Sequence, residues 1–317
     1  MERRYFPGLN AEEFQHPLDR EALKGLMKVK GFDFLTKKVL EWGLERVVRL
    51  KLLSSGLKVT ERQCPSIYRV FMDCCEILDV REPPDLFIES GGANAYTTGY
   101  TRPAVVVTTG LVNIMEEDEL YFIFGHELGH VKCGHVLYMM MARHIGQIME
   151  WIGQVTLGAG KLVGKGVELA LLEWSRKAEF SADRAGLIAA QSEEAALSAF
   201  MKLMVPARRI WNEVDKGEIL RQAEEFDEVS RSDLLMSFYR IYYGLGMTHP
   251  WIVLRAREAV NWAYSPQYKS ILSRGVSREE AERARERRGV GPACPWCGLP
   301  IRPGDRFCRF CGRPLTS

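Results

Sequence analysis

The sequence predicts a mostly helical α+β protein in which a small sheet lies beside a central helix and a separate module closes the chain. Apolar residues recur at helical spacing among charged ones, first over residues 1–84 and again after residue 110. Strand-forming runs punctuated by glycine are confined to residues 85–109. Two Cys-x-x-Cys pairs follow a charged stretch at the C-terminus.

These patterns divide the 317 residues into four regions. An N-terminal helical region, residues 1–84, is expected to pack on a central domain that spans residues 85–265. A charged helical linker is expected over residues 266–291, and residues 292–317, which carry the two Cys-x-x-Cys pairs, resemble a four-cysteine zinc ribbon. The composition, 46% hydrophobic and 26% charged, allows a sizeable core, while a net charge of +2 provides no general argument for a nucleic-acid partner.

The sequence carries no obvious targeting or membrane-spanning segment. Charges from Glu2 onward interrupt any secretory leader, so the mature protein is expected to begin near Met1. The longest uncharged runs, such as residues 103–115, are shorter than the roughly 18 residues of a spanning helix. Eight cysteines, four scattered and four in pairs, suit a reducing compartment. We therefore expect a cytoplasmic protein without a transmembrane helix.

The predicted sheet directly precedes the central helix. Pro83 and Pro84 end the helical pattern, and strand-forming runs follow at residues 85–89, 94–96 and 102–109. The free edge of such a sheet can hold an extended peptide by main-chain hydrogen bonds. A purely scaffolding role explains the pattern equally well.

The central helix, expected over residues 120–132, carries the motif His126-Glu127-Leu-Gly-His130. Two imidazoles four residues apart lie on one helix face and can share a tetrahedral Zn²⁺. Glu127, about 60° round the helix from His130, can reach a water at that metal. Two histidines satisfied within the core would produce the same motif, which also occurs by chance.

A third ligand must come from further along the chain. On a continuing helix His135 lies opposite His126, and Cys133 lies two turns away, so neither suits the same ion. A later helix carries Glu179 and Asp183 on one face. One carboxylate with two histidines is a standard catalytic zinc set, and Asp183 would then orient a ligand imidazole. A surface charge pair with the flanking arginines is the alternative.

Three motifs in this order resemble those of the M48 metallopeptidases, the family of the CAAX prenyl protease and of bacterial membrane quality-control peptidases. They are His126-Glu-Leu-Gly-His130, Glu179-Phe-Ser-Ala-Asp183, and Thr248-His249-Pro250 followed by Arg255. The stretch Asn94-Ala95-Tyr96 is similar to the substrate-cleft strand of that family. The resemblance covers residues 87–260.

The resemblance implies a zincin-like metallopeptidase domain and a zinc-dependent endopeptidase that acts on peptides or unfolded proteins. It makes Glu127 the general base, lets Asp183 hold a ligand imidazole, and assigns one catalytic Zn²⁺ to His126, His130 and Glu179. His249 becomes a donor to the tetrahedral oxyanion, with Arg255, Asn94 and Ala95 near the cleft. From the residues alone, His249 before Pro250 equally suits a helix start or a packing role.

Many members of that family carry transmembrane helices around the motif. Here residues 137–172 are apolar and glycine-rich, but Arg143, Glu150, Lys161 and Lys165 interrupt them. We expect a close-packed helical hairpin, with shallow membrane association as the alternative. This departure from the family pattern favours a soluble or peripherally membrane-bound peptidase.

The C-terminal cysteines, Cys294, Cys297, Cys308 and Cys311, have the spacing of a structural Cys₄ zinc site. So short a module cannot bury enough core to fold unaided, so a second, structural Zn²⁺ would supply its folding energy. Disulfide pairing is the alternative. The ribbon could contact a protein partner, whereas nucleic acid is disfavoured because its aromatic residues are needed inside the module.

A second function class stays open on the sequence alone. The protein could be an inactive peptidase-like scaffold whose zinc ribbon binds a protein or nucleic-acid partner. The complete set of ligands and general base argues against this alternative, because a scaffold does not require all of these side chains together.

Overall fold

The computed structural model describes residues 3–155, 161–231 and 251–288, together with residues 301 and 315. The expected zinc-ribbon cysteines and His249 therefore lie outside the described residues. The helices of the described part, with two short 3₁₀ helices labelled η, are η1 (Ala11–Glu13), α1 (Pro17–Leu26), α2 (Phe32–Trp42), α3 (Leu44–Ser55), α4 (Pro65–Ile77), α5 (Thr109–Ile114), α6 (Glu117–Lys132), α7 (Val136–Arg143), α8 (Ile145–Val155), α9 (Lys161–Ala190), α10 (Glu193–Met204), η2 (Arg208–Glu213), α11 (Lys216–Arg231), α13 (Ile252–Ala263), α14 (Pro266–Ser273) and α15 (Arg278–Arg288).

Four strands form one mixed sheet in the order β1-β2-β4-β3. β1 (Leu57–Val59) and β3 (Ala95–Thr98) run antiparallel to their neighbours, whereas β2 (Asp85–Glu89) and β4 (Ala104–Thr108) pair in parallel. β4 is buried along its whole length, because its valines meet apolar layers on both faces of the sheet. The expectation of a mostly helical protein with a small sheet is confirmed, although β1 makes residues 1–84 less purely helical than expected.

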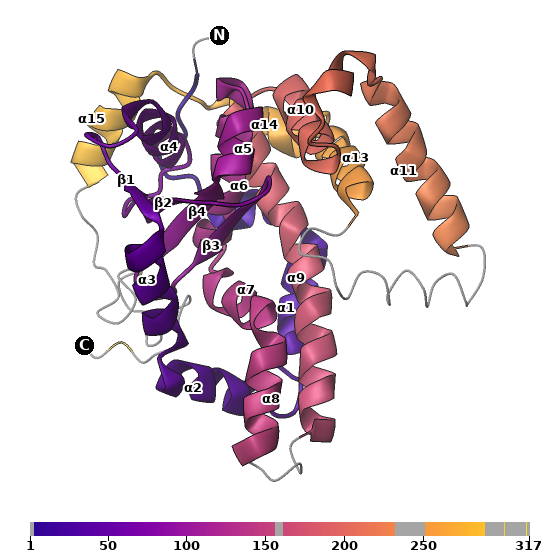
Figure 1. The fold of residues 1–317 in the computed structure, drawn as a ribbon. Coiled ribbons are helices and arrows are strands. Elements are labelled where there is room, and N and C mark those ends of the chain that lie inside the picture. The colour runs from indigo at the N-terminus through magenta and orange to yellow at the C-terminus, as the bar shows by residue number, and fades with distance from the viewer. Residues whose placement is uncertain (1–2, 156–160, 232–250, 289–300, 302–314, 316–317) are drawn as a thin grey trace.

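Two long helices, α6 and α9, pack against each other next to this sheet (Figure 1). α6 is buried from Glu119 to Val131, and its first turn is stabilised by a capping box between Glu116 and Glu119. α9 runs the length of the molecule beside it. Its C-terminal half packs with α4, α6, α10 and the sheet in the larger core. Its N-terminal half surrounds Trp174 with α1, α2, α7 and α8 in a second core.

The expected helical hairpin is present as α8 and the first half of α9. Ile145, Ile148, Val167 and Leu171 from the two helices are buried in the second core. Among the helices that the structure describes, none combines the length and apolar character needed to cross a bilayer.

The charged helix α15, which lies in the predicted linker region, is bound to the domain by ion pairs and hydrogen bonds. Its Arg278 bonds the hydroxyl of Tyr5 and the carboxylate of Asp73, and its Arg285 reaches Asp79 at 3.1 Å. Ser277 and Glu280 form a capping box at its start. The helix has almost no apolar stripe, so ion pairs to buried acids on and after α4 hold it against the domain.

Candidate metal centre

The candidate centre forms where α6 and α9 lie unusually close together. Gly129 of α6 faces α9 so closely that a Cβ atom there would lie 2.7 Å from the Cβ of Ala185. Gly125 faces Ala189 in the same way, and Gly186 of α9 faces the backbone of Phe122. Glycine is required here because any side chain would push the two helices apart. The close approach brings residues of the His-Glu-x-x-His motif to a carboxylate on α9.

Three buried side chains converge at this crossing: His126 and His130 from α6, and Glu179 from α9. One donor atom from each lies within 4.8 Å of the other two. The Nε2 atom of His126 is 3.6 Å from Oε2 of Glu179, and Nε2 of His130 is 3.5 Å from Oε1. Glu179 is buried, so the alternative that it forms a surface charge pair with the flanking arginines is wrong.

The donor set fits Zn²⁺ in both chemistry and spacing. Two histidines and one carboxylate are a common catalytic zinc set that leaves a fourth position open. Ligand atoms about 2.1 Å from a tetrahedral ion lie about 3.4 Å apart, close to the separations between Glu179 and the two imidazoles. The Nδ1 atoms of His126 and His130 both contact other side chains, so the Nε2 atoms are the ones presented to a metal.

Asp183 lies behind His126, where the sequence predicted an orienting carboxylate. Its Oδ1 is 2.9 Å from Nδ1 of His126. Arg255 of α13 donates to both oxygens of Asp183, at 2.8 and 2.6 Å, and lies 2.9 Å from Glu179. Burial raises the pKa of Asp183, but the charge and hydrogen bonds of Arg255, together with the contact to His126, outweigh this effect and keep the pKa below its usual value. Arg255 therefore links the carboxylates of Glu179 and Asp183 through ion pairs.

Glu127, the candidate base, is buried and held by the edge strand of the sheet. The hydroxyl of Thr97 on β3 donates to Oε2 of Glu127 at 2.6 Å. Thr97 and Ala95 point toward α6, because alternate residues of a strand face opposite sides. The sheet thus fixes the carboxylate that follows the first histidine.

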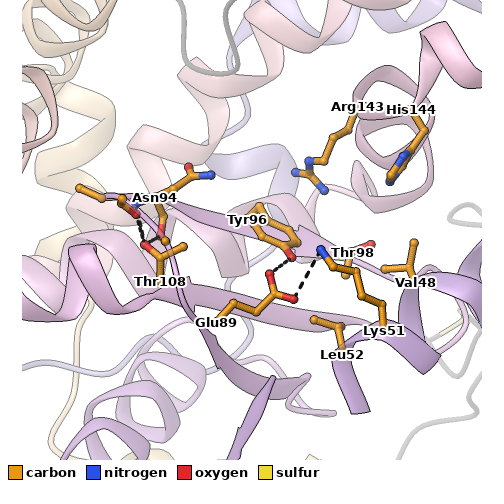
Figure 2. A pocket seen from close by; sticks show the side chains of 13 residues that line it. Val48, Lys51, Leu52, Glu89, Asn94, Tyr96, Thr98, Thr108, Arg143 and His144 are labelled. Atoms are coloured by element: carbon orange, nitrogen blue, oxygen red, sulfur yellow. Dashed lines mark hydrogen bonds and ion pairs between the residues drawn. The ribbon is translucent and has the colours of Figure 1, made fainter. Parts of the chain in front are cut away.

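The other face of β3 borders a cavity of about 520 Å³ (Figure 2). Asn94, Tyr96 and Arg143 line it, and Arg143 lies over the ring of Tyr96 with 4.6 Å to its centroid. The Tyr96 hydroxyl donates to Glu89 at 2.7 Å. Nη1 of Arg143 also donates to the main-chain oxygen of Thr97 on the free edge of β3. Ala95, expected near a cleft, thus lies on the strand that separates this cavity from Glu127, and Asn94, expected there too, directly precedes this strand and lines the cavity.

His135 does not join the three donor atoms, although the reason differs from the one expected. α6 ends at Lys132, because Gly134 has a positive φ and reverses the chain. His135 donates its main-chain N–H back to the carbonyl of His130, and its ring lies behind that ligand. The glycine after the motif was a sequence signal for this turn. The family resemblance placed Arg255 near the cleft but did not indicate its contacts with Asp183 and Glu179, and nothing local in the sequence indicated a role for Thr97.

A mostly helical domain that presents His-Glu-x-x-His from one helix to a glutamate on another belongs to the class of zinc-dependent metallopeptidases. The comparisons with known proteins identify the family. The family model described as "Peptidase family M48" matches residues 61–263, and the model described as "zinc-ribbon domain" matches residues 294–315. The chain therefore belongs to peptidase family M48 and carries a C-terminal zinc-ribbon domain.

Similar curated proteins agree with this family. Plastoglobule-localized metallopeptidase 48, chloroplastic, from Arabidopsis thaliana is 31% identical over 282 residues, which cover 88% of this chain and 80% of the relative. Protease HtpX homolog 2 from Methanosarcina mazei is 27% identical over 199 residues, or 56% and 66% of the two chains. A protease HtpX homolog from Moorella thermoacetica is 30% identical over 205 residues, or 56% and 67%. No solved structure matches the chain significantly.

Proposed function

We propose that this metallopeptidase is a zinc endopeptidase in which His126, His130 and Glu179 hold the catalytic metal and Glu127 is the general base. The convergence of three buried donor atoms at the crossing of α6 and α9 is the observation that carries the proposal. A bound Zn²⁺ would supply Lewis acidity, which acidifies water and stabilises an oxyanion.

The protein's own groups move the proton. Glu127 takes a proton from the attacking water and then passes it to the leaving amine of the cleaved peptide. With Oε2 held by Thr97, Oε1 is the oxygen proposed to carry this proton. Asp183 keeps His126 in the tautomer that presents Nε2, and Arg255 offsets part of the negative charge of the two buried carboxylates, Glu179 and Asp183. His249 remains a proposed donor to the oxyanion.

The free edge of β3 is the proposed binding site for a peptide or unfolded-protein substrate. Among the strands that the structure describes, β3 pairs only with β4, and its Ala95 and Thr97 face the candidate base. An extended peptide could add to this edge by main-chain hydrogen bonds, with alternate side chains directed into the cavity beside Tyr96. Arg143 already donates to the Thr97 carbonyl, so a bound peptide would have to share or displace this contact.

For the zinc ribbon we propose a structural Zn²⁺ held by Cys294, Cys297, Cys308 and Cys311, and a role in targeting or regulation through a protein partner. The match to a zinc-ribbon family supports the metal. Four thiolates fill a tetrahedral site and leave no position for catalysis.

We also propose that the enzyme works in the cytoplasm and can associate peripherally with anionic membranes. Three apolar side chains one turn apart on α3 are exposed: Val47 (64%), Leu50 (70%) and Leu53 (57%). Residues 24–58 around them contain nine Lys or Arg against three Asp or Glu. Exposed apolar residues within a basic surface are typical of interfacial binding. Co-sedimentation with phosphatidylserine vesicles tests this, and binding that Leu50→Ser leaves unchanged would contradict it.

The decisive test of the catalytic proposal compares two glutamate variants. Glu127→Gln should retain zinc but lose casein hydrolysis by about 10²-fold to 10⁴-fold, because the amide cannot accept the proton. Glu150→Gln on the exposed face of α8 is the matched control and should hydrolyse casein at the wild-type rate. Wild-type hydrolysis by Glu127→Gln would remove this residue from the mechanism. Absence of hydrolysis by the zinc-loaded wild type would favour an inactive scaffold.

A further inference from the structure

A buried row of three side chains lies behind the proposed ligand His130. Its Nδ1 atom is 3.1 Å from Nδ1 of His135, and Nε2 of His135 is 3.1 Å from Oδ2 of Asp19. His135 and Asp19 are both fully buried. The row joins three separate elements, since His130 lies on α6, His135 in the turn after it, and Asp19 on α1.

Metal binding imposes a proton arrangement on this row. If Nε2 of His130 binds a metal, the ring proton of His130 must be on Nδ1. The acceptor within reach of this proton is Nδ1 of His135. That atom of His135 must then be the acceptor, which places the His135 proton on Nε2. Nε2 faces Asp19 in a contact outside ideal hydrogen-bond alignment and has no other partner among the described residues. The carboxylate of Asp19 is the acceptor that this arrangement requires.

Asp19 is held in place independently of the histidines. Trp174 donates its indole N–H to Oδ1 at 3.0 Å, while Ser181 and Gln15 donate to Oδ2 at 2.7 and 2.9 Å. These donors satisfy an ionised carboxylate in a site without solvent, and they fix its position relative to α9. Asp19 therefore provides a rigid anchor rather than a mobile partner.

We infer that His135 and Asp19 are positioning residues that hold His130 in its metal-binding tautomer and orientation. Asp183 contacts His126 directly, whereas Asp19 acts on His130 through an intervening imidazole. The inference rests on the proposed zinc site. It also makes α1 part of the metal centre, although the match to family M48 begins only at residue 61.

Metal titration of the apo full-length chain tests this inference with two variants of His135. His135→Phe keeps the ring shape but removes the acceptor, and should weaken zinc affinity about 10-fold to 100-fold. His135→Asn places an amide oxygen where Nδ1 was, so it should recover part of the affinity although the link to Asp19 is lost. Cobalt(II) absorption distinguishes the two candidate sites, because the thiolate ligands of the ribbon produce a sulfur-to-metal charge-transfer band that a His/Glu site lacks.

Asp73→Asn is the matched control. Asp73 is also a buried carboxylate, but it accepts from the hydroxyls of Tyr5 and Tyr121 in the larger core. This variant should lower the melting temperature and leave cobalt affinity at the His/Glu site unchanged.

The order wild type, His135→Asn, His135→Phe in decreasing affinity supports the inference. Equal affinity for wild type and His135→Phe would overturn it, as would an Asn variant no better than Phe, or an equal loss in the Asp73→Asn control. A wild-type chain that binds cobalt only through thiolates would instead refute the proposed zinc site itself.

Discussion

Replacement of Gly129 by alanine tests whether the close approach of α6 and α9 creates the metal centre. The added Cβ would lie 2.7 Å from the Cβ of Ala185 and 3.1 Å from the Cα of Ala182. Carbon atoms normally rest about 3.5–4.0 Å apart, so the helices must separate locally by roughly 1 Å. The overlap involves backbone and a methyl group, which cannot rotate out of the way.

The expected effect on stability is smaller than the effect on the site. Overpacking costs about 1–3 kcal/mol, and the better helix propensity of alanine offsets about 1 kcal/mol of it. The same 1 Å shift moves Glu179 away from two imidazoles whose donor atoms lie 3.5 and 3.6 Å from it. A displacement of this size can reduce catalysis about 10²-fold. Urea unfolding should therefore show a loss of about 0–2 kcal/mol, while zinc affinity and casein hydrolysis fall by a far larger factor.

Gly146→Ala is the matched control, because a Cβ atom at this exposed position on α8 meets nothing within 4 Å. It should raise the free energy of unfolding by up to about 1 kcal/mol and leave zinc affinity unchanged. If Gly129→Ala bound zinc and cleaved casein like the wild type, the helix contact would not determine the site geometry.

Three further perturbations follow from the structure. Burial and the nearby charge of Arg184 lower the pKa of His16 from 6.5 to about 4, and the neutral ring accepts the Leu18 amide. The free energy of unfolding should therefore be full above pH 6.5 and fall by about 1–2 kcal/mol toward pH 4, after allowance for partial solvation. Urea unfolding at pH 7 and 5 should show this loss in the wild type and little of it in His16→Asn, and equal losses would exclude His16 as the cause. Free zinc at about one hundred times its Kd should raise the free energy of opening in wild-type α6, measured by amide hydrogen exchange, by about 2.7 kcal/mol. Glu179→Ala should abolish this protection, and protection that persists would place the third ligand elsewhere. Arg278→Gln removes an ion pair to Asp73 in which the arginine side chain is about half exposed. Helix α15 should then become more sensitive to proteases, and the free energy of unfolding should fall by about 1 kcal/mol. An unchanged digestion pattern would mean that other contacts hold the helix.

Local periodicity was enough to predict the parts of the centre that lie on single helices. The four-residue spacing of His126 and His130 places them on one face of α6, and the same spacing puts Glu179 and Asp183 on one face of α9. The glycine-rich strand region likewise appeared where it was expected. These features are set by backbone geometry within a few residues, so a pattern in the sequence reports them directly.

Contacts between distant segments were decided only by the tertiary structure. Asp19 looks like an ordinary acidic residue in the first turn of α1, and Thr97 looks like a strand residue, yet they meet His135 and Glu127 from far along the chain. The charged helix α15 has no apolar stripe, so its ion pairs with α4 could not be read from its own pattern. Periodicity identifies which residues share a face. Which face meets another depends on the close packing of α6 and α9, where glycines leave room for the chains to touch.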